Sequence, residues 1–255
     1  MRSTDWDKIA PEYYKHIDSP FSKGVKNSIF RMIRKVADPE NGVVLEVGCG
    51  TGALVPFLSR NFKRVIAVDI SKKMVEIAQE KNSTLENVEF KVMDMLNITR
   101  LQEKFDVIVA VNSIIMPNIV KVNKVLKKIY RVLKRGGTFI GIFPSFDATV
   151  YHALITYDKE FEKRHSRKKA KRATNRLISQ KQQDFCYGFF CSGGKQKHFY
   201  GFELIYRLRL AGFKKIRLGK VEYPWESVEF DPNPKRFLDE KVYDRIWDWI
   251  VHVEK

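Results

Sequence analysis

The sequence predicts an α/β fold: a doubly wound, mostly parallel sheet of seven strands with helices on both faces. Short, mainly apolar runs at 43–47, 65–68, 105–111 and 138–143 are typical of strands that parallel sheets bury on both faces. Segments with apolar residues at helical spacing, at 71–81 and 123–134, separate these runs. Alternation of this kind favours strands and helices that follow one another in a single α/β unit.

Residues 1–40 are expected to form a helical lid before the first strand. Their apolar stripe is Trp6, Ile9, Ala10, Tyr13 and Ile17, at spacings of three and four residues. Ser19 and Pro20 interrupt it, and a second helical segment is expected over 24–36. The run 38–42, DPENG, predicts a turn into the first strand.

A glycine-dense turn follows the first strand and leads into a helix expected over 53–60. Gly48, Gly50 and Gly52 leave the backbone bare where a ligand or the next helix approaches closely. Unpaired amides at the start of that helix suit a carboxylate or phosphate. The dinucleotide-binding fingerprint is G-x-G-x-x-G, whereas this stretch is E-x-G-x-G-x-G with Glu46 before the loop.

The spacing E-x-G-x-G-x-G resembles motif I of the class I S-adenosylmethionine-dependent methyltransferases. RVLKRGGTFIGIF, at 131–143, closely resembles the late landmark of that family, in which glycines end a helix and begin a strand. DWDKIAPEYY, at 5–14, resembles the opening of quinone and other small-molecule methyltransferases, the "type 11" group. The resemblance is close over 42–143 and loose over 199–254. It implies a Rossmann-like sheet and S-adenosylmethionine as the cofactor.

The resemblance also implies a role for particular residues. The glycine loop would hold the methionyl part, Asp69 at the end of the second strand would accept the ribose hydroxyls, and Asp94 would accept the adenine amine. Two alternatives stay open: Asp69 is only the cap of the helix that begins near Ser71, and Asp94 is only a turn residue. The full set expected to contact the cofactor is Tyr13, Glu46, Gly48, Cys49, Gly50, Thr51, Gly52, Asp69, Ile70, Met74, Asp94, Met95, Asn112 and Ser113.

Tyr13 joins that set because a Tyr in this opening helix covers the cofactor in the family. The alternative is that Tyr13 and Tyr14 only pack the helix on the core. Asn112 and Ser113 follow the fourth strand, at the edge that faces the methyl group in the family. If the acceptor atom is a hydroxyl or an activated carbon, a general base is needed. The candidates are His198, Tyr14 and His152, although a lone His is more often structural.

The stretch 112–118, NSIIMPN, disfavours two classes of methyltransferase. It lacks the N-P-P-Y or D-P-P-Y signature of enzymes that methylate exocyclic amines of DNA or protein glutamine. It also lacks the Pro-Cys nucleophile of cytosine-C5 enzymes.

Residues 145–198 are expected to form an inserted cap over the carboxyl edge of the sheet, where they wall the acceptor pocket. One helix is expected over 148–183, and it includes the basic segment 163–176, which either is a solvated face or binds anions. The cap is rich in aromatic residues, which favour a small, partly apolar acceptor: Phe146, Tyr151, Phe185, Tyr187, Phe189 and Phe190. Single-stranded RNA readers also combine aromatic and basic residues, so RNA remains an alternative.

The division expected is a lid at 1–40, a cofactor-binding core at 41–144, the cap at 145–198 and the rest of the core sheet at 199–255. In the last part a helix is expected over 202–210, followed by a sixth strand. The run 247–254 is expected to be a final antiparallel strand. Its rival is a helix with Ile246, Trp249, Ile250 and Val253 on one face.

Composition excludes some classes and leaves others open. With 44% hydrophobic residues, a mean hydropathy of −0.33 and no apolar run near the ~20 residues of a membrane span, we expect no membrane segment. The N-terminus has no signal-peptide core, so we expect a cytoplasmic protein. Cys49, Cys186 and Cys191 are expected to be reduced, and no metal is expected because Cys186, Cys191 and His198 match no zinc pattern.

The net charge of +17 fits either an anionic partner or a lysine-rich solvated surface. The function predicted from the sequence is methyl transfer from S-adenosylmethionine to a small, partly apolar acceptor. Two alternatives stay open: an RNA methyltransferase, and a catalytically silent subunit that binds the cofactor. The sequence leaves the oligomeric state open.

Overall fold

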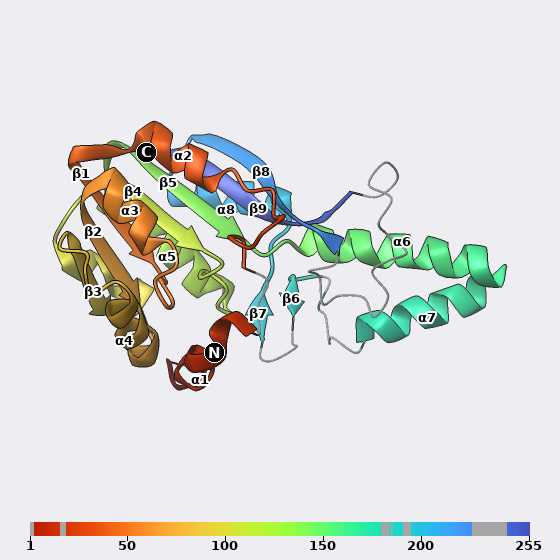
Figure 1. Ribbon diagram of the computed structural model, residues 1–255. Helices are drawn as coiled ribbons and strands as arrows, with labels where there is room; N and C mark the ends of the chain where they lie inside the picture. Colours follow the sequence, from red (N-terminus) through yellow and green to blue (C-terminus); the bar gives the residue numbers. More distant parts are fainter. Residues whose placement is uncertain (1–2, 16–18, 180–183, 185, 191–194, 226–243) are drawn as a thin grey trace.

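A seven-stranded sheet forms the centre of the computed structural model, which describes residues 3–15, 19–179, 184, 186–190, 195–225 and 244–255 (Figure 1). The strand order is β3-β2-β1-β4-β5-β9-β8, and β9 runs antiparallel to both of its neighbours. The mostly parallel, doubly wound sheet predicted from the sequence is confirmed. The strands are β1 (Asp38–Val47), β2 (Phe62–Asp69), β3 (Val88–Val92), β4 (Phe105–Val111), β5 (Leu133–Phe143), β8 (Lys215–Tyr223) and β9 (Ile246–Glu254).

Helices cover both faces of this sheet. Along β4, Ile108 and Ala110 pack into one hydrophobic cluster, while Val107 and Val109 pack into the cluster on the opposite face. Because both faces of β4 are buried, its sequence does not alternate between apolar and polar residues. The first cluster holds α5 (Ile119–Val132), α8 (Gly201–Ala211) and the short helix η2 (Met95–Leu101). The other face carries α2 (Ile29–Val36), α3 (Val55–Asn61) and α4 (Lys72–Lys81).

The start of β1 contains the turn expected over 38–42. Asp38 Oδ1 accepts hydrogen bonds from the backbone N–H groups of Glu40 and Asn41, at 3.1 and 3.0 Å. Asp38 pairs with Phe62 and Val43 with Arg64, so the register shifts between them. The turn is therefore an irregularity inside the strand, and the strand begins five residues earlier than the sequence predicted.

The N-terminal segment is helical but shorter than expected. It consists of α1 (Ser3–Ile9), the 3-10 helix η1 (Ala10–Lys15) and α2, which begins at Ile29 although the sequence predicted a start near residue 24. Asp7 holds this segment on α4, because its Oδ1 accepts from Ser71 Oγ at 2.6 Å and from the Lys73 N–H at 3.1 Å. Ile17, expected on the same stripe, lies outside the described residues.

The cap differs most from the sequence prediction. Instead of one helix over 148–183, α6 (Phe146–Arg164) and α7 (Arg167–Ser179) form an antiparallel hairpin that projects beyond the carboxyl edge (Figure 1). His165 ends α6 in the left-handed conformation, with φ of +47°, and this reverses the chain. The hairpin is followed by two short strands, β6 (Phe189–Phe190) and β7 (Gln196–Lys197), which the sequence did not predict.

The C-terminal part completes the sheet as expected. β9 is the antiparallel strand predicted for 247–254, so the alternative helix is wrong. The helix and sixth strand expected after residue 201 are α8 and β8. Residues 226–243, between β8 and β9, lie outside the described residues.

Candidate functional site

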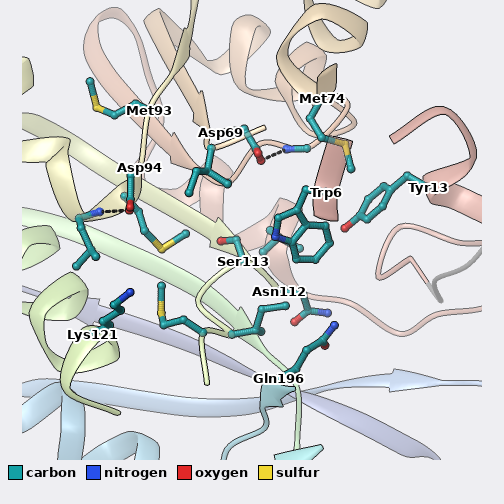
Figure 2. A pocket seen from close by; sticks show the side chains of 18 of the residues that line it. Trp6, Tyr13, Asp69, Met74, Met93, Asp94, Asn112, Ser113, Lys121 and Gln196 are labelled. Carbon is teal, nitrogen blue, oxygen red and sulfur yellow. Dashed lines mark hydrogen bonds between the residues drawn. The ribbon is translucent and has the colours of Figure 1, made fainter. Parts of the chain in front are cut away.

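A pocket opens at the carboxyl edge of β1, β2, β3 and β4, where the loops that follow these strands meet (Figure 2). Its free space is about 1000 Å³, which includes the solvent-filled space at its open mouth. Asp69 and Asp94 lie on one side, and Asn112, Lys121 and Gln196 lie across from them (Figure 2). The expected cofactor residues that line it are Tyr13, Gly48, Gly50, Asp69, Ile70, Met74, Asp94, Met95, Asn112 and Ser113.

The glycine loop shapes one wall through its bare backbone. Gly48 has φ of +77°, and a Cβ there would lie 2.3 Å from the Ser113 Cβ, so the two strand ends approach through the missing side chain. Gly50 has φ of +52°, and a Cβ there would meet only the Tyr13 ring, at 3.8 Å. A side chain at Gly50 would therefore fill the pocket itself.

The backbone amides of the glycine loop bind other groups of the protein. Those of Gly48 and Cys49 donate to the Val68 carbonyl at 2.8 and 3.0 Å, and that of Gly52 donates to the Cys49 carbonyl. The Gly50 amide donates to Asp69 Oδ2 at 2.9 Å. These four loop amides are therefore already paired within the protein, whereas the sequence prediction concerned the amides at the start of the following helix, and no ligand contact tests it.

Asp69 joins the loops after β1 and β2. Its Oδ2 accepts from Gly50, and its Oδ1 accepts from the Ser71 N–H at 2.9 Å. The cap of α4 is Ser71, whose hydroxyl accepts from the Met74 N–H at 3.1 Å, so Asp69 is not the cap residue. Burial raises the pKa of Asp69, and the backbone hydrogen bonds oppose this effect. Each carboxylate oxygen has a second lone pair that a ligand hydroxyl can use.

Glu46 lies below the loop and does not line the pocket. Its side chain is buried, and Oε2 has no hydrogen-bond partner among the described residues. Burial and, to a lesser degree, the charge of Asp69 raise the pKa of Glu46 to about 8. Glu46 is therefore a buried acid beneath the loop that holds its proton at neutral pH. A cation in the pocket would stabilise its ionised form.

Asp94 and Met95 stand at the end of β3. Asp94 Oδ1 accepts from the Leu96 N–H at 2.8 Å and so caps η2, while the same residue lines the pocket. The Met93 N–H donates to the Asp69 carbonyl at 2.7 Å, which joins the ends of β3 and β2. Asp94 is therefore both a cap and a pocket residue.

Asn112 and Ser113 form the floor after β4. Ser113 Oγ donates to the Val47 carbonyl at 2.6 Å, and Asn112 takes a left-handed conformation with φ of +46°. Asn112 Nδ2 donates to Asp248 Oδ2 at 2.8 Å, and Asp248 also accepts from the Tyr223 hydroxyl at 2.7 Å. Burial raises the pKa of Asp248, which these hydrogen bonds partly offset. The last strand thus fixes the side chain that follows β4.

Comparison with known proteins identifies the core of this chain. Residues 44–137 match the family model described as "Methyltransferase domain". Residues 44–137 therefore form a domain of the class I S-adenosylmethionine-dependent methyltransferase type. A putative methyltransferase of Bacillus subtilis, YqeM, is 32% identical over 106 residues, which are 40% of this chain and 42% of that protein.

Other methyltransferases are similar in sequence to this chain over stretches of different length. The demethylmenaquinone methyltransferase of Lactobacillus johnsonii is 26% identical over 149 residues, 56% of this chain and 59% of that protein. The chain therefore spans about half the length of these curated relatives. Shorter matches bear the names of methyltransferases that act on ribosomal RNA and on a ribosomal protein. The crystal structure of the N-methyltransferase NodS of Bradyrhizobium japonicum with S-adenosyl-L-homocysteine covers 98% of both chains, at 13% identity and a TM-score of 0.59, so the fold is shared.

The N-terminal segment contributes one wall of the pocket beside the methyltransferase domain, and the sequence predicted this only in part. Trp6 and Tyr13 both line the pocket, and their ring centroids are 6.4 Å apart in an edge-to-face arrangement (Figure 2). Asp7 holds this segment on Ser71, at the cap of α4. Trp6 belonged to the expected apolar stripe, but the spacing alone could not distinguish a core residue from a pocket residue.

Several lining residues were not predicted. They come from the ends of β3 and β4, the start of α5 and the segment before β7: Met93, Leu96, Val111, Ile115, Met116, Lys121, Lys195 and Gln196. Met93, Leu96 and Val111 directly adjoin predicted site residues, so position at the strand end was an available signal. Lys195 and Gln196 had no such signal.

Other expected residues lie elsewhere. Cys49, Thr51 and Gly52 do not line the pocket, and neither do His198 and His152; the Tyr14 side chain lies outside the described part. His198 is buried, and burial followed by the charge of Lys197 lowers its pKa to about 4. His152 is buried with its ring centroid 5.9 Å from that of Trp225. The structure therefore does not bring the proposed bases together at the pocket.

The described aromatic side chains of the cap do not line this pocket either. Phe146 packs against Tyr200 with centroids 5.1 Å apart, and Tyr151 packs against Trp247 at 5.5 Å. Tyr187 is exposed, Phe189 is buried behind Lys195, whose Nζ lies 4.3 Å from the centroid of its ring, and Phe185 and the Phe190 side chain lie outside the described residues.

The described residues also bear on the predictions about cysteines, metal sites and membrane helices. Cys49 and Cys186 are free thiols, Cys191 is not described, and no three His, Cys, Asp or Glu side chains gather as a metal site within the described ranges. No helix in the described part of the chain combines the length and the apolar character needed to cross a membrane.

Proposed function

We propose that this methyltransferase transfers a methyl group from S-adenosylmethionine to a small, partly apolar acceptor bound in the same pocket. One observation carries the proposal: a single pocket at the carboxyl edge is lined by Gly50, which has no side chain, by two carboxylates and by two aromatic rings. The carboxylates are those of Asp69 and Asp94, and the rings are those of Trp6 and Tyr13. When bound, S-adenosylmethionine supplies an activated methyl group on a sulfonium that is a good leaving group. The protein then has to bind the cofactor and the acceptor, orient them toward each other and exclude water from between them.

The residues on the β1–β3 side suit the cofactor. Gly50 leaves room for the methionyl part of the cofactor, and Asp69 has lone pairs for two ribose hydroxyls. Asp94 can accept a hydrogen bond from the exocyclic amine of adenine. Met74, Met93 and Met95 provide flexible apolar contacts for a flat ring. Glu46 is a buried acid within the charge field of Asp69, and its ionised form would balance a cationic ligand.

The residues on the β4–α5 side suit the acceptor. Val111, Ile115 and Met116 are apolar, whereas Lys121 and Lys195 bring positive charge to the same pocket. Trp6 and Tyr13 occupy the side where a long polymer would otherwise pass. This combination supports a compact acceptor with an apolar body and an acidic or polar group, as does the relative named for demethylmenaquinone.

RNA is a second candidate because one observation favours it. The first two turns of α7, on the projecting hairpin, expose five basic residues: Arg167, Lys168, Lys169, Lys171 and Arg172. A polynucleotide held there would release counterions, so its affinity would fall steeply with salt. The affinity of a small acceptor inside the pocket would change little.

Labelled methyl transfer to fractionated cell extract tests the proposal. The label should enter a lipid or small-molecule fraction, and the variant with Lys168, Lys169, Lys171 and Arg172 changed to Gln should retain that activity. Trimming Ile115 and Met116 to Ala should impair it, while calorimetry with S-adenosylmethionine should change less. Label in RNA that disappears in the four-charge variant would overturn the choice of acceptor. Cofactor binding without transfer to any fraction would favour a silent subunit.

A further inference from the structure

The outer surface of α5 and α8 carries an apolar stripe beside a basic row. On α8, Phe202, Tyr206 and Leu210 recur every four residues, and their side chains are 72%, 59% and 46% exposed. Four residues is close to one helical turn, so the three lie along one side of the helix over about 12 Å. Large apolar side chains exposed in a row point to an interaction surface more strongly than scattered ones.

The basic row comes from both helices. α5 contains five Lys or Arg residues and no acid, and Lys124, Lys127 and Arg131 are exposed on it. Arg209 on α8 and Lys214 just after it are also exposed. The outer surfaces of the two helices are contiguous, because Arg207 donates to Asn123 Oδ1 at 3.0 Å. We call this surface the α5–α8 face; it consists of Val120, Lys124, Lys127, Arg131, Phe202, Tyr206, Arg209, Leu210 and Lys214.

The one acidic residue of the two helices is already neutralised. Glu203 is the one acidic residue of α8, and Lys197 and Arg207 contact its carboxylate at 2.7 and 2.6 Å. Its side chain is 13% exposed. The α5–α8 face therefore presents positive charge and apolar groups together, without a compensating exposed carboxylate from either helix.

We propose that the α5–α8 face docks on the surface of an anionic lipid bilayer. Exposed aromatic residues prefer the boundary between water and lipid, and each basic residue near an anionic surface adds attraction. Three of the five positive residues are lysines, which protein–protein interfaces disfavour at their centres. Leu210 offers no ring for a base to stack on, which disfavours single-stranded RNA. A second copy of this chain is disfavoured because each carries a net charge of +17.

Docking through this face also explains its position relative to the pocket. Lys121, in the first turn of α5, lines the pocket, and Val120 beside it is 61% exposed on the α5–α8 face. The face therefore begins at the rim of the pocket. A molecule with an apolar body could reach the pocket from the bilayer, although docking itself does not depend on methyl transfer.

Sedimentation with vesicles tests this proposal on the full chain. The wild-type protein should bind vesicles of equimolar phosphatidylcholine and phosphatidylglycerol and should bind pure phosphatidylcholine vesicles at least tenfold more weakly. Changing Lys124, Lys127, Arg131 and Arg209 to Gln should lower the partition coefficient at least tenfold. Changing Phe202, Tyr206 and Leu210 to Ser should remove the binding that remains at high salt.

The matched control removes the same charge from another place. Changing Lys168, Lys169, Lys171 and Arg172 on α7 to Gln lowers the net charge by four, and binding should stay within twofold of the wild type. An equal loss in this control would overturn the proposal, since any four charges would then suffice. Absence of wild-type binding to the anionic vesicles at low salt would also overturn it. If the triple Ser variant does not unfold cooperatively, Leu210→Ser alone replaces it and should give a smaller loss in the same direction.

Discussion

The two sides of the carboxyl edge are built in different ways. Around the glycine loop, the side chains that line the pocket are fixed by backbone groups close to the ends of β1, β2 and β3. Asp69 binds the Ser71 N–H two residues away and the Gly50 N–H in the neighbouring loop, and Asp94 binds the Leu96 N–H. Each contact follows once the strands are in register.

In the cap the contacts join segments that are distant in sequence or in space. Lys197 is fully buried, and its ammonium binds Glu203 Oε2 at 2.7 Å while its backbone N–H donates to the Ile115 carbonyl at 2.8 Å. The Phe199 N–H donates to the Pro144 carbonyl, which ties the end of the cap to its beginning. The glycine-loop side can therefore be altered locally, whereas the cap depends on a few buried links.

The largest effect is expected from breaking the link at Lys197. Lys197→Met should lower the free energy of unfolding by about 3–5 kcal/mol, because it leaves the Glu203 carboxylate with less compensation in a poorly hydrated place. The midpoint of urea unfolding measures this. The double variant Lys197→Met, Glu203→Gln should lose less than Lys197→Met alone. A double variant that is the less stable of the two would show that the pair acts by packing and not by charge.

The next effect is expected at the glycine loop itself. Gly48→Ala puts a Cβ 2.3 Å from the Ser113 Cβ at a positive φ, so strain of ~1–2 kcal/mol and overpacking of ~1–3 kcal/mol should add in thermal unfolding. Gly136 is the matched control, since its φ is +75° but a Cβ there has no neighbour within 4 Å. Gly136→Ala should show the strain alone. Equal losses in the two variants would mean that Ser113 moves away without cost.

The same contrast explains how much the sequence could predict. The core strands and the pocket residues Gly48, Gly50, Asp69 and Asp94 were located correctly, because strand ends in a parallel sheet meet at one edge. β9 was predicted by its apolar run and confirmed. The role of each residue toward the cofactor stays a prediction, since no ligand contact tests it.

The failures concentrate where a position depends on tertiary contacts. The break at His165 has no glycine or proline signal, because a histidine adopts the left-handed conformation there. The aromatic residues of the cap were expected in the pocket, but Phe146 and Tyr151 pack on Tyr200 and Trp247 from later parts of the chain. Composition cannot distinguish these two uses of an aromatic ring. Lys195 and Gln196 reach the pocket through the pairing of β7 with β6, which the sequence did not reveal.

A smaller effect is expected for the carboxylate that both loops share. Asp69→Ala should weaken S-adenosylmethionine binding by roughly 1.5–3 kcal/mol, the scale of hydrogen bonds to a charged group, as measured by calorimetry. Asp38→Ala is the control, because Asp38 also accepts from two backbone N–H groups but lies at the opposite end of β1. Its cofactor affinity should match that of the wild type. Normal affinity in Asp69→Ala would limit that residue to joining the two loops.

The smallest effect, per unit of pH, is expected from Glu46. Its pKa is about 8 in the folded protein, against an ordinary value of 4.5, so the folded state holds a proton that the unfolded chain releases between these values. The resulting stabilisation is fully present below pH 4.5 and is lost as the pH rises through about 8. The buried His198 acts in the opposite direction only below its ordinary pKa of 6.5, because its folded pKa is about 4.

Between pH 6.5 and 8 the wild-type stability should therefore fall by roughly 1 kcal/mol per pH unit relative to Glu46→Gln, which is near the limit for one proton. Thermal unfolding of both proteins across that range measures the difference, and parallel curves would mean that Glu46 is ionised throughout. Adding S-adenosylmethionine should flatten the wild-type curve, because a cation in the pocket favours the ionised carboxylate, and Glu46→Gln should not show this change.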